Sequence, residues 1–209
     1  MGLYSRLIFP RLLDLTMSGQ ELSQYRHSLL QSVRGNVLEI GFGTGLNIPH
    51  YGEGVTAITA IDPNEGMAAI AASRVDSSAI PITLKTASAE ALPMDTAVFD
   101  AVVCTWTLCS IPNIEQALSE AYRVLKPGGK FFFIEHGLSP EQGVSTWQRW
   151  ITPFQRRVAD GCHLDRPMDA LVKTVFEHVE IDTFYATDLP KVMGYFYQGV
   201  AIKPGCLDL

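Results

Sequence analysis

The fold of this chain is decided at Val37-Leu38-Glu39-Ile40-Gly41-Phe42-Gly43-Thr44-Gly45-Leu46-Asn47. The run from Val37 to Ile40 is short and apolar with a β-branched residue at each end, which predicts a buried strand. The glycines at positions 41, 43 and 45 allow a tight turn and let a ligand approach the backbone without a Cβ in the way. We expect a helix to begin after this turn, with its free N–H groups facing that ligand.

Glu39 and Leu46 indicate which ligand the turn would take. Nicotinamide and flavin enzymes also place a glycine-rich turn between a strand and a helix, so the glycines alone identify no cofactor. The dinucleotide pattern would put its third glycine at position 46, where this chain has Leu46, and here that glycine falls at Gly45. A carboxylate at Glu39 suits a cationic amino-acid group rather than a pyrophosphate. At these residues the chain resembles class I methyltransferases, which implies S-adenosylmethionine as the cofactor, bound by Glu39, the turn glycines and Asn47.

A second acidic residue, Asp62, follows the predicted strand at 55–61. It lies 21 residues beyond Gly41, close to the ~20 expected for an acid that binds ribose hydroxyls. Pro63 and the residues after it open a predicted helix, on which Met67 is placed to pack against a planar ring. The alternative is that Asp62 only caps this helix, but its position and the motif together favour ribose binding.

The adenine site is expected after the predicted strand at 80–86. Many class I methyltransferases carry an aspartate at the position of Ser88, where it accepts a hydrogen bond from the adenine amino group. This chain offers only a hydroxyl there, so we expect the Ala89 backbone or Glu90 to hold adenine. The most apolar predicted strand, 99–105, brings two further cofactor contacts at its end, Cys104 and Thr105.

Strand ends also supply the candidates for catalysis. Residues just past the carboxyl ends of strands line the ligand crevice in open α/β sheets. His136 directly follows the predicted strand at 130–135, although a histidine there can also be a simple capping group. Trp106 and Cys109 follow the strand at 99–105 and are expected to shape a small apolar substrate pocket.

The composition of the chain limits the classes of substrate, metal site and location that we expect. The net charge of −6 argues against a nucleic-acid substrate, because phosphate binding needs a basic surface. The four cysteines, Cys104, Cys109, Cys162 and Cys206, show no CxxC spacing, so we expect no metal site. The two that lie in or just after an apolar strand are expected to be small buried hydrophobes. No run of eighteen apolar residues and no signal peptide occurs, which favours a cytoplasmic protein without a transmembrane segment. At 209 residues, one domain over 1–209 is the simplest organisation.

Residues 1–34 are expected to form a helical cap on this domain. Leucines at roughly helical spacing are interrupted by Pro10, and a second helix is predicted over 20–33 with Ser18 as its cap. Two interpretations stay open: these helices cover the sheet edge, or Tyr4 and Tyr25 help to close a lid over the substrate. Arg6 and Arg11 beside leucines favour at most weak contact with a membrane surface.

The carboxyl-terminal third supplies two helices and two strands. An apolar stripe on the predicted helix at 145–159 is expected to pack mostly in the core; it contains Trp147, Trp150, Ile151, Phe154 and Val158. A polar loop spans 160–166, and a final helix is predicted over 168–178. The strands at 179–186 and 195–202 can pair antiparallel at the sheet edge. Together, the predicted strands and helices indicate a doubly wound α/β fold with a seven-stranded, mostly parallel sheet whose last strand is antiparallel.

Several segments resemble the methyltransferase-like thiol S-methyltransferases, which methylate hydrogen sulfide and small thiols. They are Cys104-Thr105-Trp106-Thr107-Leu108-Cys109-Ser110, Ile134-Glu135-His136, Ser145-Thr146-Trp147, Asp160-Gly161-Cys162, Ile61-Asp62-Pro63-Asn64 and Gly194-Tyr195. The resemblance covers nearly the whole chain but departs at its start, where family members carry a hydrophobic membrane anchor. It implies a small thiol or sulfide as acceptor.

A thiol acceptor must lose its proton, because the thiolate is the nucleophile. His136 is the first candidate base, and Asp160, His163 and Arg166 are weaker candidates for closing the site or orienting the acceptor, with Tyr195 in the pocket. The alternatives are N-methylation of a phospholipid amine, C-methylation of a quinone ring, and a cofactor-binding protein without turnover. The sequence does not indicate an oligomeric state.

Overall fold

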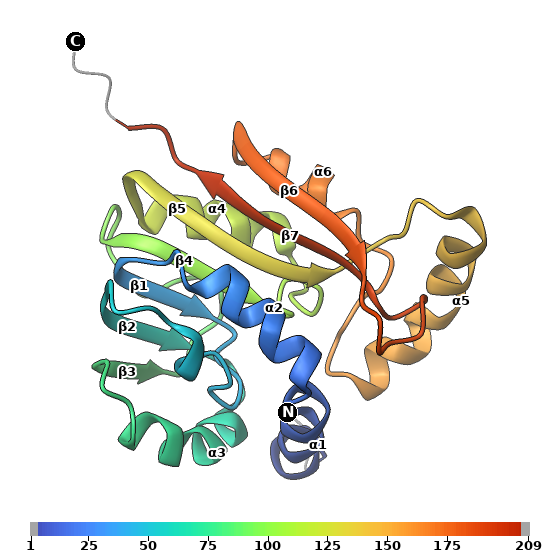
Figure 1. The fold of residues 1–209 in the computed structure, drawn as a ribbon, viewed down its shortest axis with the longest axis horizontal. Helices are drawn as coiled ribbons and strands as arrows, with labels where there is room; N and C mark the ends of the chain where they lie inside the picture. Colours follow the sequence, from blue (N-terminus) through green and yellow to red (C-terminus); the bar gives the residue numbers. More distant parts are fainter. Residues whose placement is uncertain (1–3, 206–209) are drawn as a thin grey trace.

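The computed structural model describes residues 4–205, so Cys206 lies outside the described residues. Seven strands form one sheet in the order β3-β2-β1-β4-β5-β7-β6 (Figure 1). Their bounds are β1 Gly35–Ile40, β2 Val55–Ile61, β3 Ile82–Lys85, β4 Phe99–Thr105, β5 Leu125–His136, β6 His178–Tyr185 and β7 Tyr195–Ile202. The pairs of β1 with β2, β1 with β4, β2 with β3 and β4 with β5 are parallel, whereas β7 is antiparallel to both β5 and β6. The predicted sheet with its reversed last strand is confirmed.

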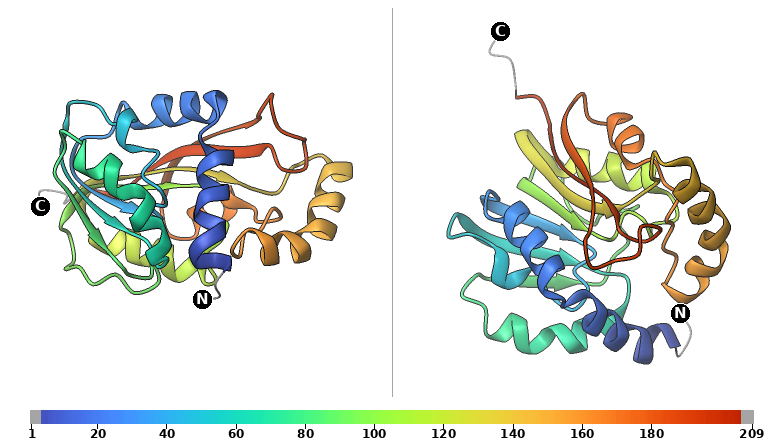
Figure 2. Two further views of the ribbon diagram at one scale, coloured as in Figure 1. Left: turned by 90° about the horizontal axis from the view of Figure 1, so that it is seen from below. Right: turned by 45° about the vertical axis from the view of Figure 1, so that its right-hand side comes forward.

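Helices cover both faces of the sheet, as Figure 2 shows. Their bounds are η1 Tyr4–Ile8 (a π-helix), α1 Phe9–Met17, α2 Gln20–Leu30, η2 Ile48–His50 (a 3₁₀ turn), α3 Glu65–Asp76, α4 Ile114–Val124, α5 Gln142–Val158 and α6 Met168–Lys173. One core cluster joins α4 and α6 to the sheet, and a second joins α2 and α3 to the opposite face. Connections on both sides of a parallel sheet leave its carboxyl ends free to form a site.

The helix expected directly after the glycine turn is absent. Gly41, Gly43 and Gly45 have φ values of +72°, +55° and +81°, which a right-handed helix cannot use. The next residues contain Pro49, Gly52 and Gly54 before β2 begins, so only the single turn η2 forms. The prediction was wrong because helix-breaking residues leave no uninterrupted run in which a longer helix could form.

Other boundaries also differ from the sequence prediction. Ser18 does not cap α2: Gly19 occupies that position, and the Ser18 hydroxyl donates to the carbonyl of Leu15. Pro10 lies in the first turn of α1, directly after η1, so it does not interrupt the helical stretch. Residues 126–129 form a bulge inside β5, since β4 pairs with Leu125 and then with Lys130. The final helix ends at Lys173, five residues earlier than predicted.

The predicted core packing of the α5 stripe is wrong for most of its members. Trp147, Trp150 and Phe154 are 56%, 75% and 65% exposed, and Val158 is also exposed. The buried face of α5 is polar instead and consists of Ser145, Gln148 and Thr152. Gln148 accepts the N–H of Ser139 and donates to the carbonyl of Gly137, and the Thr152 hydroxyl accepts the N–H of Leu164. The helix is therefore held by loop backbone, which leaves its apolar side facing outward.

Candidate active site

The glycine-rich turn is fixed by hydrogen bonds to the end of β2. The N–H groups of Gly41 and Phe42 donate to the carbonyl of Ile61 at 2.9 and 3.0 Å. The Asp62 carboxylate accepts from the N–H of Gly43 at 2.9 Å and from that of Asn64 at 2.8 Å. Asn64, not Asp62, caps α3, because its side chain accepts the N–H of Gly66. Burial raises the pKa of Asp62, an effect that the two backbone donors partly offset.

A cavity of about 810 Å³ opens at the carboxyl ends of β1, β2, β4 and β5. It brings together most of the site residues predicted from sequence. On its wall lie Tyr4, Gly41, Gly43, Asn47, Asp62, Pro63, Met67, Ala89, Glu90, Thr105, Trp106, Cys109, His136 and Asp160. Its size is typical of a ligand site, and its lining is mainly apolar with a few converging polar groups.

Six predicted residues are not on this wall. Cys104 is fully buried in the core, and Gly45 adopts a positive φ beside the side chains of Phe42 and Ile48. His163 pairs with Asp165 at 3.5 Å, while Arg166 donates to the carbonyl of Leu108. Tyr195 packs against Tyr185 and Tyr197, and Glu39 lies behind Asn47. In this arrangement His163, Arg166 and Tyr195 support the loops around the cavity rather than line it.

Glu39 is 1% exposed and has polar partners on both carboxylate oxygens. Oε1 accepts from the Asn47 amide at 2.8 Å, and Oε2 accepts from the Tyr51 hydroxyl at 2.6 Å. Burial raises the pKa of Glu39 to about 7, although these hydrogen bonds and the charge of Arg26 act in the opposite direction. Glu39 is thus held ready to interact with a cation through Asn47.

The sequence reasoning gave no role to Glu135, which organises the other side of the cavity. Its carboxylate is fully buried and accepts the backbone N–H groups of Thr107, Leu108 and Cys109 at 2.8, 2.9 and 3.2 Å. Burial raises its pKa to about 7. The signal in the sequence is an acid inside the apolar run of β5, since a buried charge needs several donors. Glu135 therefore fixes the segment that carries Trp106 and Cys109.

His136 follows Glu135 and lies on the cavity wall. Its Nδ1 is 2.9 Å from the carbonyl of Met193, so this nitrogen carries the proton and Nε2 remains an acceptor. Burial lowers the pKa of His136 to about 4, which keeps the ring neutral. A hydrogen bond with the Cys162 thiol, together with burial, raises the pKa of the Cys109 thiol well above its usual range. Cys109 is therefore an uncharged part of the wall.

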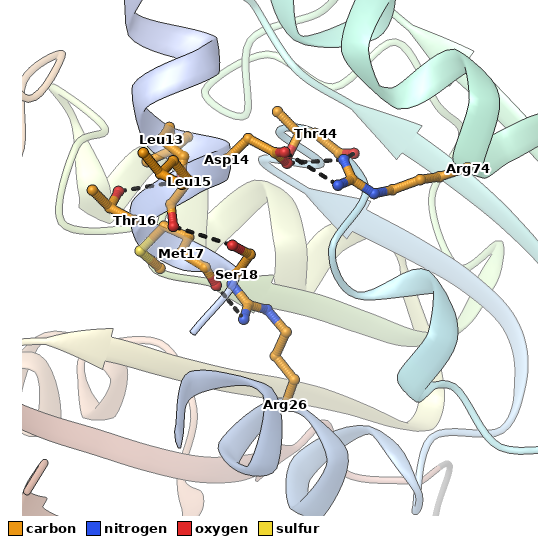
Figure 3. A network of polar contacts seen from close by, with 9 residues as sticks. All are labelled: Leu13, Asp14, Leu15, Thr16, Met17, Ser18, Arg26, Thr44 and Arg74. Carbon is orange, nitrogen blue, oxygen red and sulfur yellow. Dashed lines mark hydrogen bonds and ion pairs between the residues drawn. The ribbon is translucent and has the colours of Figure 1, made fainter. Parts of the chain in front are cut away.

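The amino-terminal helices form part of the cavity. Figure 3 shows Asp14 of α1 bonded to the Thr44 hydroxyl at 2.6 Å and to Arg74 of α3 at 2.8 Å, which fastens α1 beside the glycine turn. The cavity is lined on this side by Phe9, Leu12, Leu13, Thr16 and Met17. Tyr4 belongs to the same wall and donates to the carbonyl of Val158, whereas Tyr25 packs on Phe184 and Phe196 of the sheet. The two tyrosines thus have different surroundings.

Residues 4–205 contain no group of three or more histidine, cysteine, aspartate or glutamate side chains that could hold a metal ion. Over the same residues, no helix combines the length and the apolar character that crossing a membrane requires.

Comparison with known proteins identifies the family. A model of the methyltransferase domain matches residues 38–133, from β1 into β5. A thiol S-methyltransferase from Homo sapiens is 31% identical over 173 residues, which are 77% of this chain and 69% of the human protein. The chain belongs to the class I S-adenosylmethionine-dependent methyltransferases. Its cofactor is S-adenosylmethionine, and it is an enzyme of this class.

Other methyltransferases are similar to this chain in sequence or in fold. A phosphatidylethanolamine N-methyltransferase from Cereibacter sphaeroides is 31% identical over 133 residues, 63% of this chain and 64% of the bacterial protein. Phosphoethanolamine N-methyltransferase 2 from Haemonchus contortus, solved with S-adenosylhomocysteine, has the same fold at a TM-score of 0.66 and 15% identity, covering 95% of this chain and 61% of that one. This methyltransferase spans 58% to 70% of the length of the curated thiol S-methyltransferases that it matches.

The residues of the cavity fit the cofactor of the family. A Cβ at Gly41 would collide with the side chain of Thr107, so the turn can pack against the segment after β4 only with glycine at this position. Asp62 presents a buried carboxylate at the place expected for ribose hydroxyls, and Met67 lies on the same wall. In the adenine region, Glu90 is engaged by the N–H of Asn113 at 2.6 Å and by the Ser88 hydroxyl at 3.2 Å.

Proposed function

We propose that this methyltransferase transfers a methyl group to hydrogen sulfide or a small thiol. One observation carries the proposal: besides the segment Ile61-Asp62-Pro63-Asn64, three of the segments by which the chain resembles thiol S-methyltransferases contribute to the wall of one cavity. These segments bring Trp106 and Cys109 from the end of β4, His136 from the end of β5, and Asp160 from the loop after α5. A mainly apolar wall suits an uncharged acceptor.

Bound S-adenosylmethionine supplies a methyl group on a positively charged sulfur. With that methyl group bound in line, the acceptor sulfur would form a bond to the methyl carbon as the bond from that carbon to the sulfonium breaks, giving methanethiol from hydrogen sulfide or a methyl thioether from a thiol, together with S-adenosylhomocysteine. The thiol proton must leave before or during this step, because the thiolate is the nucleophile. Displacement in line needs little further chemistry, so positioning by the cavity wall supplies much of the rate.

His136 is our proposed acceptor of the thiol proton. Its Nδ1 donates to the Met193 carbonyl, which orients the ring and leaves Nε2 free to accept a hydrogen bond. The pKa of about 4 keeps this nitrogen unprotonated, but it also makes the ring a weak base for a thiol of ordinary pKa near 8.5. We therefore propose that His136 mainly orients the S–H group and receives the proton as the sulfur attacks.

Product analysis tests the function. Purified protein is incubated with methyl-labelled cofactor and a panel of thiols, amines and quinols, and the labelled products are identified. We expect methylated thiol or methylated sulfide. A labelled lipid amine or quinol without labelled thiol contradicts the acceptor while leaving the cofactor assignment intact, and no labelled product from any acceptor favours a binding protein without turnover.

The exposed faces of α1 and α5 favour a second candidate, N-methylation of a phospholipid amine at an anionic membrane surface. Leu7, Ile8, Leu12 and Leu15 are exposed around α1, and Trp147, Trp150 and Phe154 are exposed on α5. Both helices contribute residues to the cavity wall. Arg149, Arg156 and Arg157 on α5 are exposed and α5 contains no acidic residue, although the whole chain is negatively charged. Tryptophan and arginine on an apolar helix face suit a lipid interface.

Vesicle binding separates the two candidates. For a thiol enzyme we expect at most weak sedimentation with phosphatidylserine-containing vesicles. Strong sedimentation that is lost at high salt and in a Trp150→Ser/Phe154→Ser variant would favour the phospholipid candidate. Leu84→Ser on β3, another exposed apolar position, is the control substitution.

A further inference from the structure

The cavity contains an unusual set of polar atoms. Three buried side-chain nitrogen or oxygen atoms among residues 4–205 lack a hydrogen-bond partner: Arg26 Nε, Asn47 Oδ1 and Trp106 Nε1. All three residues line the cavity. An unsatisfied buried polar group destabilises the folded state, so native proteins rarely keep one without a function. Finding them on one wall indicates that a ligand supplies the missing partners.

Arg26 and Trp106 provide two of these atoms, and both are donors. Arg26 comes from α2, is 4% exposed and donates through Nη1 to the carbonyl of Met17 at 2.8 Å, as Figure 3 shows. Its guanidinium carbon lies 4.7 Å from the centre of the Trp106 ring. Burial lowers the pKa of Arg26 to about 10, which still leaves it charged at neutral pH. A cation beside two free N–H groups suits a carboxylate.

Asn47 provides the third atom, an acceptor. Its Nδ2 donates to Glu39 Oε1 at 2.8 Å and to the Thr105 hydroxyl at 3.0 Å. Because a carboxylate of Glu39 can only accept, this pair fixes which end of the amide faces the cavity. The Oδ1 atom is therefore the free acceptor, with the carboxyl group of Glu39 directly behind it. This arrangement suits an ammonium group.

We propose that these atoms form a subsite for a zwitterionic α-amino acid group, and that it holds the methionine end of the cofactor. The carboxylate accepts from Arg26 Nε and Trp106 Nε1, and the ammonium donates to Asn47 Oδ1. Glu39 is a positioning residue that holds the Asn47 amide rather than the direct ligand expected from the sequence. The proposal rests on the cofactor assignment and is independent of the methyl acceptor.

Calorimetry with three ligands tests the subsite without measuring turnover. S-adenosylhomocysteine has the complete amino-acid end, its decarboxylated analogue lacks only the carboxylate, and 5′-methylthioadenosine lacks both charged groups. For Arg26→Gln we expect the dissociation constant of S-adenosylhomocysteine to rise about 10- to 100-fold. The same variant should change the affinity for the decarboxylated analogue and for methylthioadenosine by less than about threefold.

Two further variants separate a loss of the subsite from a general structural effect. Trp106→Phe keeps the ring beside Arg26 but removes the N–H, so we expect a loss of about three- to tenfold for S-adenosylhomocysteine alone. Arg11→Gln, on the exposed side of α1, is a control that should change none of the three affinities.

Three other outcomes of the binding measurements would contradict the proposal or the assignment on which it rests. Equal losses for all three ligands in both Arg26→Gln and Trp106→Phe would overturn the subsite and leave only a structural role. Unchanged cofactor affinity with weaker binding of a carboxylate-bearing thiol would also overturn it, because the subsite would then belong to the acceptor. Failure of the wild type to bind S-adenosylhomocysteine would contradict the cofactor assignment itself.

Discussion

The Asp62 carboxylate accepts the backbone N–H of Gly43 at 2.9 Å, so the acid at the end of β2 and the glycine turn after β1 form one unit. The same carboxylate holds Asn64 at the start of α3. A single side chain therefore sets the turn, the helix and one wall of the cavity. Any change at Asp62 should alter both the shape of the cofactor site and its contacts.

The first prediction concerns Asp62→Ala. Loss of a buried carboxylate that binds the turn, and that we expect to bind the ribose, should raise the dissociation constant of S-adenosylhomocysteine by a few-fold to a hundredfold, or roughly 1–3 kcal/mol. Calorimetry measures the change, and ligand-dependent thermal stabilisation should fall in parallel. Asp182→Ala on the exposed edge strand β6 is the matched control. If Asp62→Ala binds S-adenosylhomocysteine as tightly as the wild type does, Asp62 does not contribute to cofactor binding.

A second prediction compares two glycines with similar backbone conformations. Gly41 and Gly128 have φ values of +72° and +79°, so alanine is strained at either position. Only at Gly41 would the new Cβ collide with a side chain, that of Thr107, whereas nothing lies within 4 Å at Gly128. Gly41→Ala should therefore lower the melting temperature more than Gly128→Ala and should also weaken S-adenosylhomocysteine binding. Equal melting temperatures and equal affinities would show that the turn tolerates the extra atom.

The third prediction follows from the raised pKa of Glu39. Its ordinary value of 4.5 is raised to about 7 in the folded apoprotein, so the folded state binds its proton more tightly than the unfolded state does. This contribution to stability is complete below pH about 4.5 and is lost as pH rises through about 7. Relative to Glu39→Gln, the wild type should lose on the order of 3 kcal/mol of unfolding free energy across this range.

Urea unfolding at pH 5 and pH 8 without cofactor measures this difference. Glu141→Gln is the control: ion pairing with Lys191 lowers the pKa of Glu141, so its contribution is lost on acidification below pH about 4.5 and stays constant between pH 5 and 8. A difference between wild type and Glu39→Gln that does not change with pH would show that Glu39 titrates normally.

The fourth prediction concerns His136. His136→Ala should lower turnover with a thiol by about 10²-fold, at the lower end of general-base effects, because burial lowers the pKa of this ring to about 4. The affinity for S-adenosylhomocysteine should stay nearly unchanged. Turnover by the variant should partly recover at high pH, where the thiol ionises unaided. The plot of wild-type turnover against pH should show no inflection near pH 6.5. Wild-type turnover in His136→Ala at neutral pH would make Asp160 the next candidate.

The fifth prediction concerns metals. Transfer from a sulfonium needs no Lewis acid, and the cysteine and histidine spacings match no metal template. Activity should survive dialysis against EDTA, assayed by labelled methyl transfer. Loss of activity that Zn²⁺ or Mg²⁺ restores would contradict this expectation.

Much of the fold was predictable because it depends on local patterns. The bounds predicted for β2, β4 and β7 agree with the structure, since apolar runs bounded by turn residues mark buried strands. The α5 helix was also predicted, but its exposed apolar face was not. Periodicity shows that one face is apolar, whereas it cannot show that Gln148 and Thr152 bind loop backbone and turn that face outward.

The sequence by itself determined the family, the sheet and the cofactor loop, because glycine geometry and the offset between Gly41 and Asp62 are local properties of the chain. Only the tertiary structure decided which groups meet. Arg26 reaches Trp106 from a helix eighty positions away, and Glu135 binds the segment after β4 across the sheet. The structure also placed Asn47 between Glu39 and the cavity and lowered the pKa of His136. Burial and long-range hydrogen bonds set these properties, and both depend on packing between segments distant in sequence.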